Sequence, residues 1–98
     1  MASSKHLGGD GLAALTVLRD LIPTDGYVTQ LVTPAAGRAR LYVQNRQVAR
    51  IVEAVYAGPG VDDEWWFWWG WAEPICRVSV PEMAARQIMN ALRVFDTG

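Results

Sequence analysis

The sequence has 98 residues, the size of one domain, and 51% of them are apolar, including five Trp, three Tyr and two Phe. The formal net charge of −1 gives no long-range attraction for nucleic acid or anionic lipid, and the single cysteine, Cys76, excludes an intrachain disulfide. The longest apolar run, residues 65–72, is far shorter than the ~20 residues of a membrane-spanning helix, and the N-terminal residues lack the apolar segment of a signal peptide. We therefore expect a cytoplasmic protein with no membrane segment.

The chain is expected to begin with a flexible tail, residues 1–9, followed by a single α+β domain, residues 10–98. Asp10 suits an N-cap position, because its carboxylate can accept hydrogen bonds from the free N–H groups of a first helical turn. Apolar residues then recur at helical spacing and predict a helix over 11–22, which Pro23 ends. The residues of this apolar stripe are Leu12, Leu15, Leu18, Leu21 and Ile22.

A β-hairpin is expected next. Residues 27–33 are β-branched and aromatic, which favours a strand, and residues 39–44 alternate between apolar and polar side chains as a half-buried strand does. Residues 34–37, Pro-Ala-Ala-Gly, predict the turn that joins the two strands.

Residues 48–57 fit two patterns. Their apolar residues fit one face of a helix that a Gly-Pro pair would end, and they also fit a strand. We favour a turn at 45–49 and a strand at 50–57, because the strong strand that follows needs a neighbour. Residues 58–63 then form a hairpin loop.

The most distinctive segment is an aromatic strand, residues 64–72, which ends at residues 73–74. A helix is expected over 81–95, since Ser79 and Glu82 have the spacing of a capping box. The elements together predict the order α-β-β-β-β-α. This order indicates an α+β fold in which a four-stranded antiparallel meander carries the N- and C-terminal helices on one face.

Side chains alternate across a strand, so the aromatic strand has two faces of different composition. One face carries four rings and no charge, and we expect the helices to cover it, because each ring removes ~150–250 Å² from water. The other face combines two Trp with a Glu and a Gly, which does not suit a dry core. The first set is Trp65, Phe67, Trp69 and Trp71, and the second is Glu64, Trp66, Trp68 and Gly70.

Trp66 and Trp68 are the main candidates for a binding surface. In the expected sheet, Arg40 and Tyr42 lie on one nearby strand and Tyr56 on another. Two indoles and a tyrosine could expose ~400–500 Å² of connected apolar surface, a size that marks contact with another molecule. Trp, Tyr and Arg are also enriched at interface hot spots. The alternative is that a loop or the N-terminal tail covers both tryptophans.

This surface predicts a non-catalytic interaction domain that binds a protein, either a second copy of the chain in a homodimer or an accessory or regulatory partner. The alternative is a small apolar or aromatic ligand in a Trp-lined groove, where Arg40 would orient an acid. A single-stranded nucleic acid could also stack on such a face, with arginines along its phosphates. The acidic residues 62–64 and the net charge of −1 oppose nucleic-acid binding.

No residue pattern predicts catalysis, a cofactor or a metal site. The only histidine, His6, lies in the expected tail, so we do not expect it to pair with a Ser or Cys nucleophile. Cys76 is more typical of a small buried apolar residue than of a nucleophile. Residues 62–64 could bind a hard cation, but a solvated hairpin tip is the more common arrangement.

Three stretches of the sequence carry a resemblance to other proteins: Val43-Gln44-Asn45, the run from Trp66 to Ile75, and Ala84-Ala85. With them, the chain from residue 41 to 94 resembles a group of small uncharacterised Trp-rich proteins of high-GC Gram-positive bacteria. Members of this group commonly have Ser at the position of Gly70 and Pro at the position of Arg46. The resemblance implies that the Trp strand is a family feature, and it implies no activity.

Overall fold

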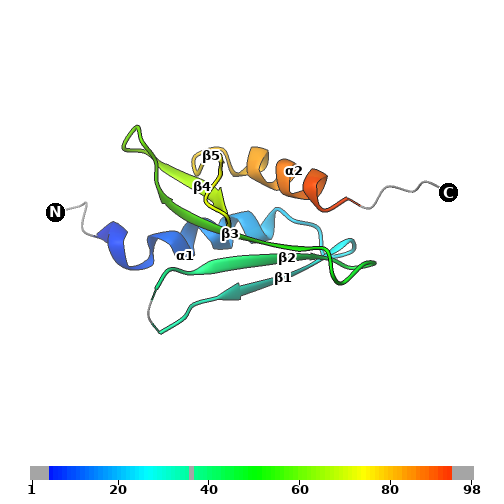
Figure 1. Cartoon of the computed structure of the whole chain (residues 1–98). Coiled ribbons are helices and arrows are strands. Elements are labelled where there is room, and N and C mark those ends of the chain that lie inside the picture. Colours follow the sequence, from blue (N-terminus) through cyan, green and yellow to red (C-terminus); the bar gives the residue numbers. More distant parts are fainter. Residues whose placement is uncertain (1–4, 36, 94–98) are drawn as a thin grey trace.

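The computed structural model describes residues 5–35 and 37–93 (Figure 1). Within these residues, two helices and five strands form an α+β domain. Within the described ranges, no helix is long and apolar enough to cross a membrane. In chain order the elements are α1 (Lys5–Asp20), β1 (Tyr27–Val32), β2 (Arg40–Asn45), β3 (Val52–Pro59), β4 (Trp65–Trp69), β5 (Pro74–Arg77) and α2 (Pro81–Ala91).

The strands form one antiparallel meander, in which each strand pairs with the next one along the chain. The α+β class, the two terminal helices and the antiparallel meander are confirmed. The choice of a strand rather than a helix for residues 50–57 is confirmed as well, because these residues include most of β3.

The expected number of strands is wrong, because the aromatic segment ends at Trp69 and a fifth strand follows it. A tight turn separates β4 from β5: the Trp69 N–H donates to the Glu73 carbonyl at 2.8 Å, and Ala72 adopts a positive φ of 71°. The sequence pattern indicates Pro74 as a strand terminator. In the structure Pro74 is instead the first residue of an edge strand, a position that tolerates its missing N–H.

The helix α1 begins at Lys5, earlier than the expected start at residue 11. Asp10 therefore lies inside the helix rather than at its N-cap. The helix includes Gly8 and Gly9, although glycine lowers helix stability by ~1 kcal/mol per residue relative to alanine. Of the expected flexible tail, residues 1–4 lie outside the described residues.

The helix α2 begins after Val80, which occupies the N-cap without a side-chain hydrogen bond. The expected capping box of Ser79 and Glu82 is therefore wrong, since Ser79 lies one residue before the cap. The helix α2 ends at Ala91, earlier than the predicted end at residue 95. Residue 95 itself lies outside the described residues.

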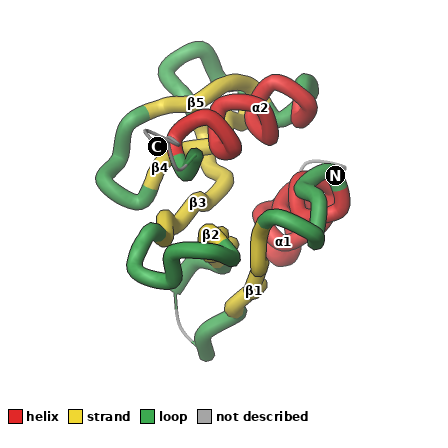
Figure 2. Tube along the Cα trace, turned by 90° about the vertical axis from the view of Figure 1, so that its right-hand side faces the viewer, coloured by secondary structure: helices red, strands yellow, loops and turns green. Residues whose placement is uncertain are grey.

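Both helices pack on the same face of the sheet, so that among the described residues no helix lies on the opposite face (Figure 2). The helix-covered face is called the inner face, and the opposite face is called the outer face. α1 packs mainly over β3 and β2, and α2 packs against β5 and α1. The core consists of Leu15, Leu18, Ile22, Leu41, Val43, Val55, Ala57, Phe67, Trp69, Ile75, Cys76, Ala84, Ala85, Ile88 and Leu92.

One face of β4 lies in this core, as the alternation of its side chains predicts. Phe67 is completely buried, Trp69 is buried, and Trp65 packs against the same cluster. The prediction is wrong for Trp71, because β4 ends before it and the chain turns. Trp71 is 55% exposed and stacks on Trp69, with ring centroids 5.0 Å apart.

Asn45 is a buried polar residue that connects two distant parts of the chain. Its Nδ2 donates to the Leu92 carbonyl at 2.7 Å, just after α2. Its Oδ1 accepts hydrogen bonds from the backbone N–H groups of Gln47 and Val48, at 2.8 and 3.1 Å. The amide therefore holds the β2–β3 turn and the end of α2 together, with its polar atoms satisfied in the core.

We expect Phe67→Ala to lower the free energy of unfolding by about 3–5 kcal/mol, because the fully buried ring would leave a cavity in the core. Urea denaturation measures this change. Val61→Ala is the control, since Val61 is 102% exposed, and it should change the free energy of unfolding by less than about 0.5 kcal/mol. An equally small effect of both substitutions would contradict the place of Phe67 in the core.

Candidate functional site

The outer face of the sheet carries the even-numbered aromatic residues of β4. In the register between β3 and β4, Tyr56 pairs with Trp68 and Gly58 pairs with Trp66. Trp66, Trp68 and Tyr56 are each half-buried, on the face that neither helix covers. The structure thus brings together three of the five residues predicted as a binding surface.

Tyr56 and Trp68 form a stacked pair. Their ring centroids are 6.3 Å apart and their planes differ by 8°, an offset arrangement that aromatic rings favour. The Trp68 Nε1–H donates to the Gly58 carbonyl at 3.2 Å, so the indole is fixed at its polar edge as well. These contacts hold the Trp68 ring in place within a single chain.

Trp66 is held by a separate set of contacts. Its Nε1–H donates to Asp62 Oδ1 at 3.0 Å, and the guanidinium carbon of Arg77 lies 5.2 Å from its ring centroid. Arg77 Nη2 also donates to Asp62 Oδ2 at 2.6 Å. The Asp62 carboxylate, the Arg77 guanidinium and the Trp66 indole therefore fix one another at this end of β4 and β5.

Asp62 is the acceptor on which this set converges. The hydrogen bond from Trp66 is the main cause that lowers the pKa of Asp62, from 3.8 to about 2, and the Glu64 backbone N–H and the Arg77 guanidinium add to it. The folded-state pKa is below the ordinary value, so the contacts of the carboxylate are complete above about pH 4. They are lost as the pH falls through about 2.

Two glycines make room for the side chains of this face. A Cβ on Gly60 would lie 2.6 Å from Trp66 Nε1, so the indole can take its place only over a glycine. A Cβ on Gly58 would lie 3.0 Å from Arg38 Nη1. The Arg38 side chain crosses this open position, and its guanidinium carbon lies 4.7 Å from the Tyr56 ring centroid.

These contacts define one surface unit, the aromatic cluster, in which two arginines flank three rings. A cation over an aromatic face is an attractive contact of ~0.5–1 kcal/mol at an exposed site, and each arginine makes one. The aromatic cluster consists of Arg38, Tyr56, Trp66, Trp68 and Arg77.

The other two predicted residues lie elsewhere on the outer face. Tyr42 pairs with Gln30 and Ala54, and Arg40 pairs with Val32 at an exposed position. Tyr42 belongs to a shallow depression of about 280 Å³ over β1, β2 and the start of β3. Its lining residues are Val28, Gln30, Val32, Tyr42, Gln44 and Val52.

The sequence prediction missed Arg38, Arg77 and Asp62 as parts of the site. Arg77 lies on the strand that the pattern did not predict. Arg38 lies two residues before β2. If the alternation of β2 is continued back to this residue, Arg38 falls on the outer face beside Gly58. The contact of Asp62 with Trp66 has no signal in the sequence, because it depends on how the loop after β3 folds back.

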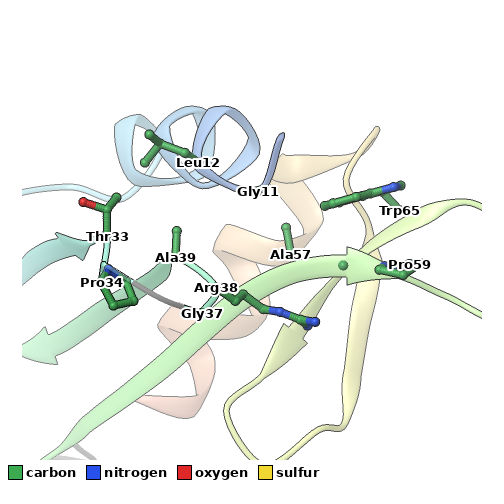
Figure 3. A pocket seen from close by; sticks show the side chains of 11 residues that line it. Gly11, Leu12, Thr33, Pro34, Gly37, Arg38, Ala39, Ala57, Pro59 and Trp65 are labelled. Atoms are coloured by element: carbon green, nitrogen blue, oxygen red, sulfur yellow. The ribbon is translucent and has the colours of Figure 1, made fainter. Parts of the chain in front are cut away.

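A second hollow lies at the other side of β3, between α1 and the β1–β2 hairpin (Figure 3). Its volume is about 370 Å³. Leu12 of α1 and Trp65 of β4 form apolar walls on either side of Ala57. The full lining is Gly11, Leu12, Thr33, Pro34, Gly37, Arg38, Ala39, Ala57, Gly58, Pro59 and Trp65.

The described residues offer little reactive chemistry. Cys76 is a buried free thiol, and its S–H donates to the Val80 carbonyl with Sγ 3.5 Å from the oxygen. Burial raises the pKa of the Cys76 thiol above its ordinary value, which lowers the fraction of reactive thiolate. Within the part of the chain that the structure describes, no group of three or more His, Cys, Asp or Glu residues could hold a metal ion.

The Trp66 indole N–H should report the titration of Asp62. We expect its NMR resonance to shift as the pH falls from about 4, with a midpoint near pH 2, because protonation weakens the acceptor. Asp62→Asn should abolish the shift. The Trp68 indole N–H is the internal control, since it donates to a backbone carbonyl that does not titrate. A midpoint at the ordinary Asp value of 3.8 would contradict the contact.

Gly60→Ala should displace the Trp66 ring and lower the free energy of unfolding by about 1–3 kcal/mol, because the added Cβ overlaps the indole. Urea denaturation and the Trp66 indole resonance measure the two effects. Gly26→Ala is the matched control, since a Cβ there meets nothing within 4 Å. A Gly60→Ala variant with an unchanged indole resonance would show that Trp66 does not pack on Gly60.

No protein-family model matches the chain. No curated protein matches it, and no solved structure matches it. The resemblance to Trp-rich bacterial proteins therefore stays a prediction from the motif.

Proposed function

We propose that this chain is a non-catalytic interaction domain that binds a protein partner through the aromatic cluster on the outer face of its sheet. The observation that carries the proposal is the placement of Trp66, Trp68 and Tyr56 on the face that both helices leave uncovered. An aromatic group in this position fits a docking surface better than a structural core, because the core is already complete on the inner face.

The composition of the aromatic cluster suits protein recognition. Trp, Tyr and Arg are the residue types that contribute most often to interface hot spots. Both indole N–H groups of the outer face are already hydrogen-bonded within the chain. A partner would therefore meet apolar ring surface and guanidinium groups, and it would leave no indole donor unsatisfied.

The rings are also fixed before any partner binds. Trp68 is stacked on Tyr56, and Trp66 is held by Asp62 and Arg77. Side chains that are ordered in the free protein lose little conformational entropy on binding, which strengthens association for the same contact area. This pre-organisation supports a binding role.

The charges of the outer face indicate the chemistry of the partner. The ion pairs formed among the described residues join Arg77 to Asp62 and Arg19 to Asp20, and neither includes Arg38 or Arg40. Both of these arginines lie on or beside the outer face. A protein surface with an apolar centre and carboxylates at its rim would complement them, whether it belongs to an accessory protein or to a second copy of the chain.

The cavity beside α1 favours a second candidate function, the binding of a small apolar ligand. Its volume of about 370 Å³ falls within the ~300–1,000 Å³ of ligand pockets. Leu12, Ala57 and Trp65 give it apolar walls, and Arg38 lies at its lining. For this candidate we propose the cavity at Trp65, on the inner side of the sheet, in place of the groove at Trp66 and Trp68 that the sequence predicts.

The double variant Trp66→Ala/Trp68→Ala tests the proposed function. We expect it to stay folded by far-UV circular dichroism and to lose binding of the protein that copurifies with the native chain at a defined mass. The expected loss of affinity is at least ~100-fold, since hot-spot tryptophans contribute ~2 kcal/mol or more each. Trp71→Ala is the matched control, because Trp71 is an exposed Trp outside the aromatic cluster.

Two results would contradict the proposal. One is a double variant that unfolds, which would assign both tryptophans to the stability of the fold. The other is a folded double variant that binds as tightly as the Trp71→Ala control. Quenching of Trp65 fluorescence by a bound small apolar molecule would favour the ligand-binding candidate instead.

A further inference from the structure

The edge of the sheet at β1 carries backbone groups that have no partner in the strand ladder. The Arg46 N–H donates to the Gly26 carbonyl at 3.1 Å, which makes this pair a hydrogen-bonded one. Bonded and non-bonded pairs alternate in an antiparallel ladder, so the even-numbered residues of β1 bond to β2. Tyr27, Thr29 and Leu31 therefore direct their N–H and C=O groups away from β2, toward the free edge.

The opposite edge, at β5, is protected in ways that β1 is not. β5 has four residues and begins with Pro74, and its pairing with β4 is irregular between Phe67 and Trp68. Each of these features hinders the addition of another strand. β1 has six residues, Tyr-Val-Thr-Gln-Leu-Val, without a proline, a charge or a register shift. In Figure 1 neither helix of the described part of the chain lies beyond β1 on its free side.

We propose that a second copy of the chain pairs with β1 in antiparallel orientation, with Thr29 opposite Thr29 of the partner subunit. In this register Tyr27 lies opposite Leu31 of the partner subunit. The three outward-facing residues of each copy then form bonded pairs, and every edge N–H and C=O is satisfied. The Tyr27 carbonyl can accept this bond in addition to the 3.4 Å contact from Arg46 Nη2, because a carbonyl has two lone pairs.

The side chains of β1 favour a second copy over another partner. The strand is uncharged, so two copies do not repel one another and no charge selects a different protein. Tyr27 and Leu31 are half-buried. Tyr27 of each copy would cover Leu31 of the partner subunit, which gives two aromatic–aliphatic pairs related by the two-fold axis. A shift of the pairing by two residues would leave edge groups unpaired, so one register is preferred.

The pairing goes beyond the proposed function, because it does not use the aromatic cluster. Opposite residues of an antiparallel pair face the same side, so the outer faces of both copies join into one surface of a ten-stranded sheet. The β3 strands of the two copies are then separated by five strand spacings of ~4.8 Å, or about 24 Å. A dimeric partner could engage both aromatic clusters at once and bind with avidity.

Analytical ultracentrifugation of the wild-type chain and of Thr29→Pro tests the pairing. We expect a wild-type mass of twice 10.8 kDa at micromolar concentration. Thr29→Pro removes the N–H at the two-fold axis but no bond to β2, so it should weaken dimerisation by more than about 10-fold. Val61→Ala is the control and should remain dimeric, because Val61 is fully exposed and lies outside both β1 and the aromatic cluster. A monomeric wild type, or a folded Thr29→Pro that dimerises as the wild type does, would overturn the proposal.

Hydrogen exchange of the wild-type chain tests the same pairing without a substitution. The amides of Tyr27, Thr29 and Leu31 should be protected at high protein concentration and should exchange at least ~10-fold faster on dilution. The amides of Val28 and Gln30 should stay protected at both concentrations, because they bond to β2. Edge amides that exchange rapidly at all concentrations would overturn the proposal. A dimer lost in the tryptophan variant and kept in Thr29→Pro would overturn it too, and would place self-association on the aromatic cluster.

Discussion

The alternation of side chains along β4 is the constraint on which the rest of the structure depends. A strand made almost entirely of aromatic residues must place rings on both faces, and its register decides which rings enter the core. Phe67 lies opposite Ala57 on the inner face, and Trp66 lies opposite Gly58 on the outer face. A slip of one residue would bury the indole N–H groups and expose the phenyl ring. The glycine opposite Trp66 and the hydrogen bond from its indole to Asp62 both favour the observed register.

Much of the fold follows from periodicity in the sequence. The β-branched and alternating patterns of residues 27–33 and 39–44 predict β1 and β2, and the pattern of 64–72 predicts which rings of β4 enter the core. Such elements are predictable because burial acts on every second residue of a strand. The start of α1 is not predictable in this way. Two glycines and an aspartate that favours an N-cap indicate a helix start near residue 10, yet the helix begins at Lys5.

The parts that the sequence does not predict depend on turns and on long side chains. The chain reverses after Trp69 without a glycine at the position of positive φ, which is Ala72, so the turn into β5 has no local signature. The aromatic cluster needs this turn, because it brings Arg77 over Trp66. Half of the candidate site, the set of outward rings, is therefore predictable from alternation. The arginines and Asp62 that fix those rings are contacts between segments, which no local pattern encodes.

The buried amide of Asn45 has a consequence for the order in which the chain folds. Every strand of the meander pairs with its neighbour in sequence, so the sheet can form through local contacts, which fold rapidly. The hydrogen bond from Asn45 to the Leu92 carbonyl joins residues 47 positions apart and cannot form until the β2–β3 turn exists. We therefore expect α2 to dock after the sheet has formed. In a chain made on the ribosome, this step waits for residues 81–92 to emerge, and until then the inner surface of β5 stays without α2.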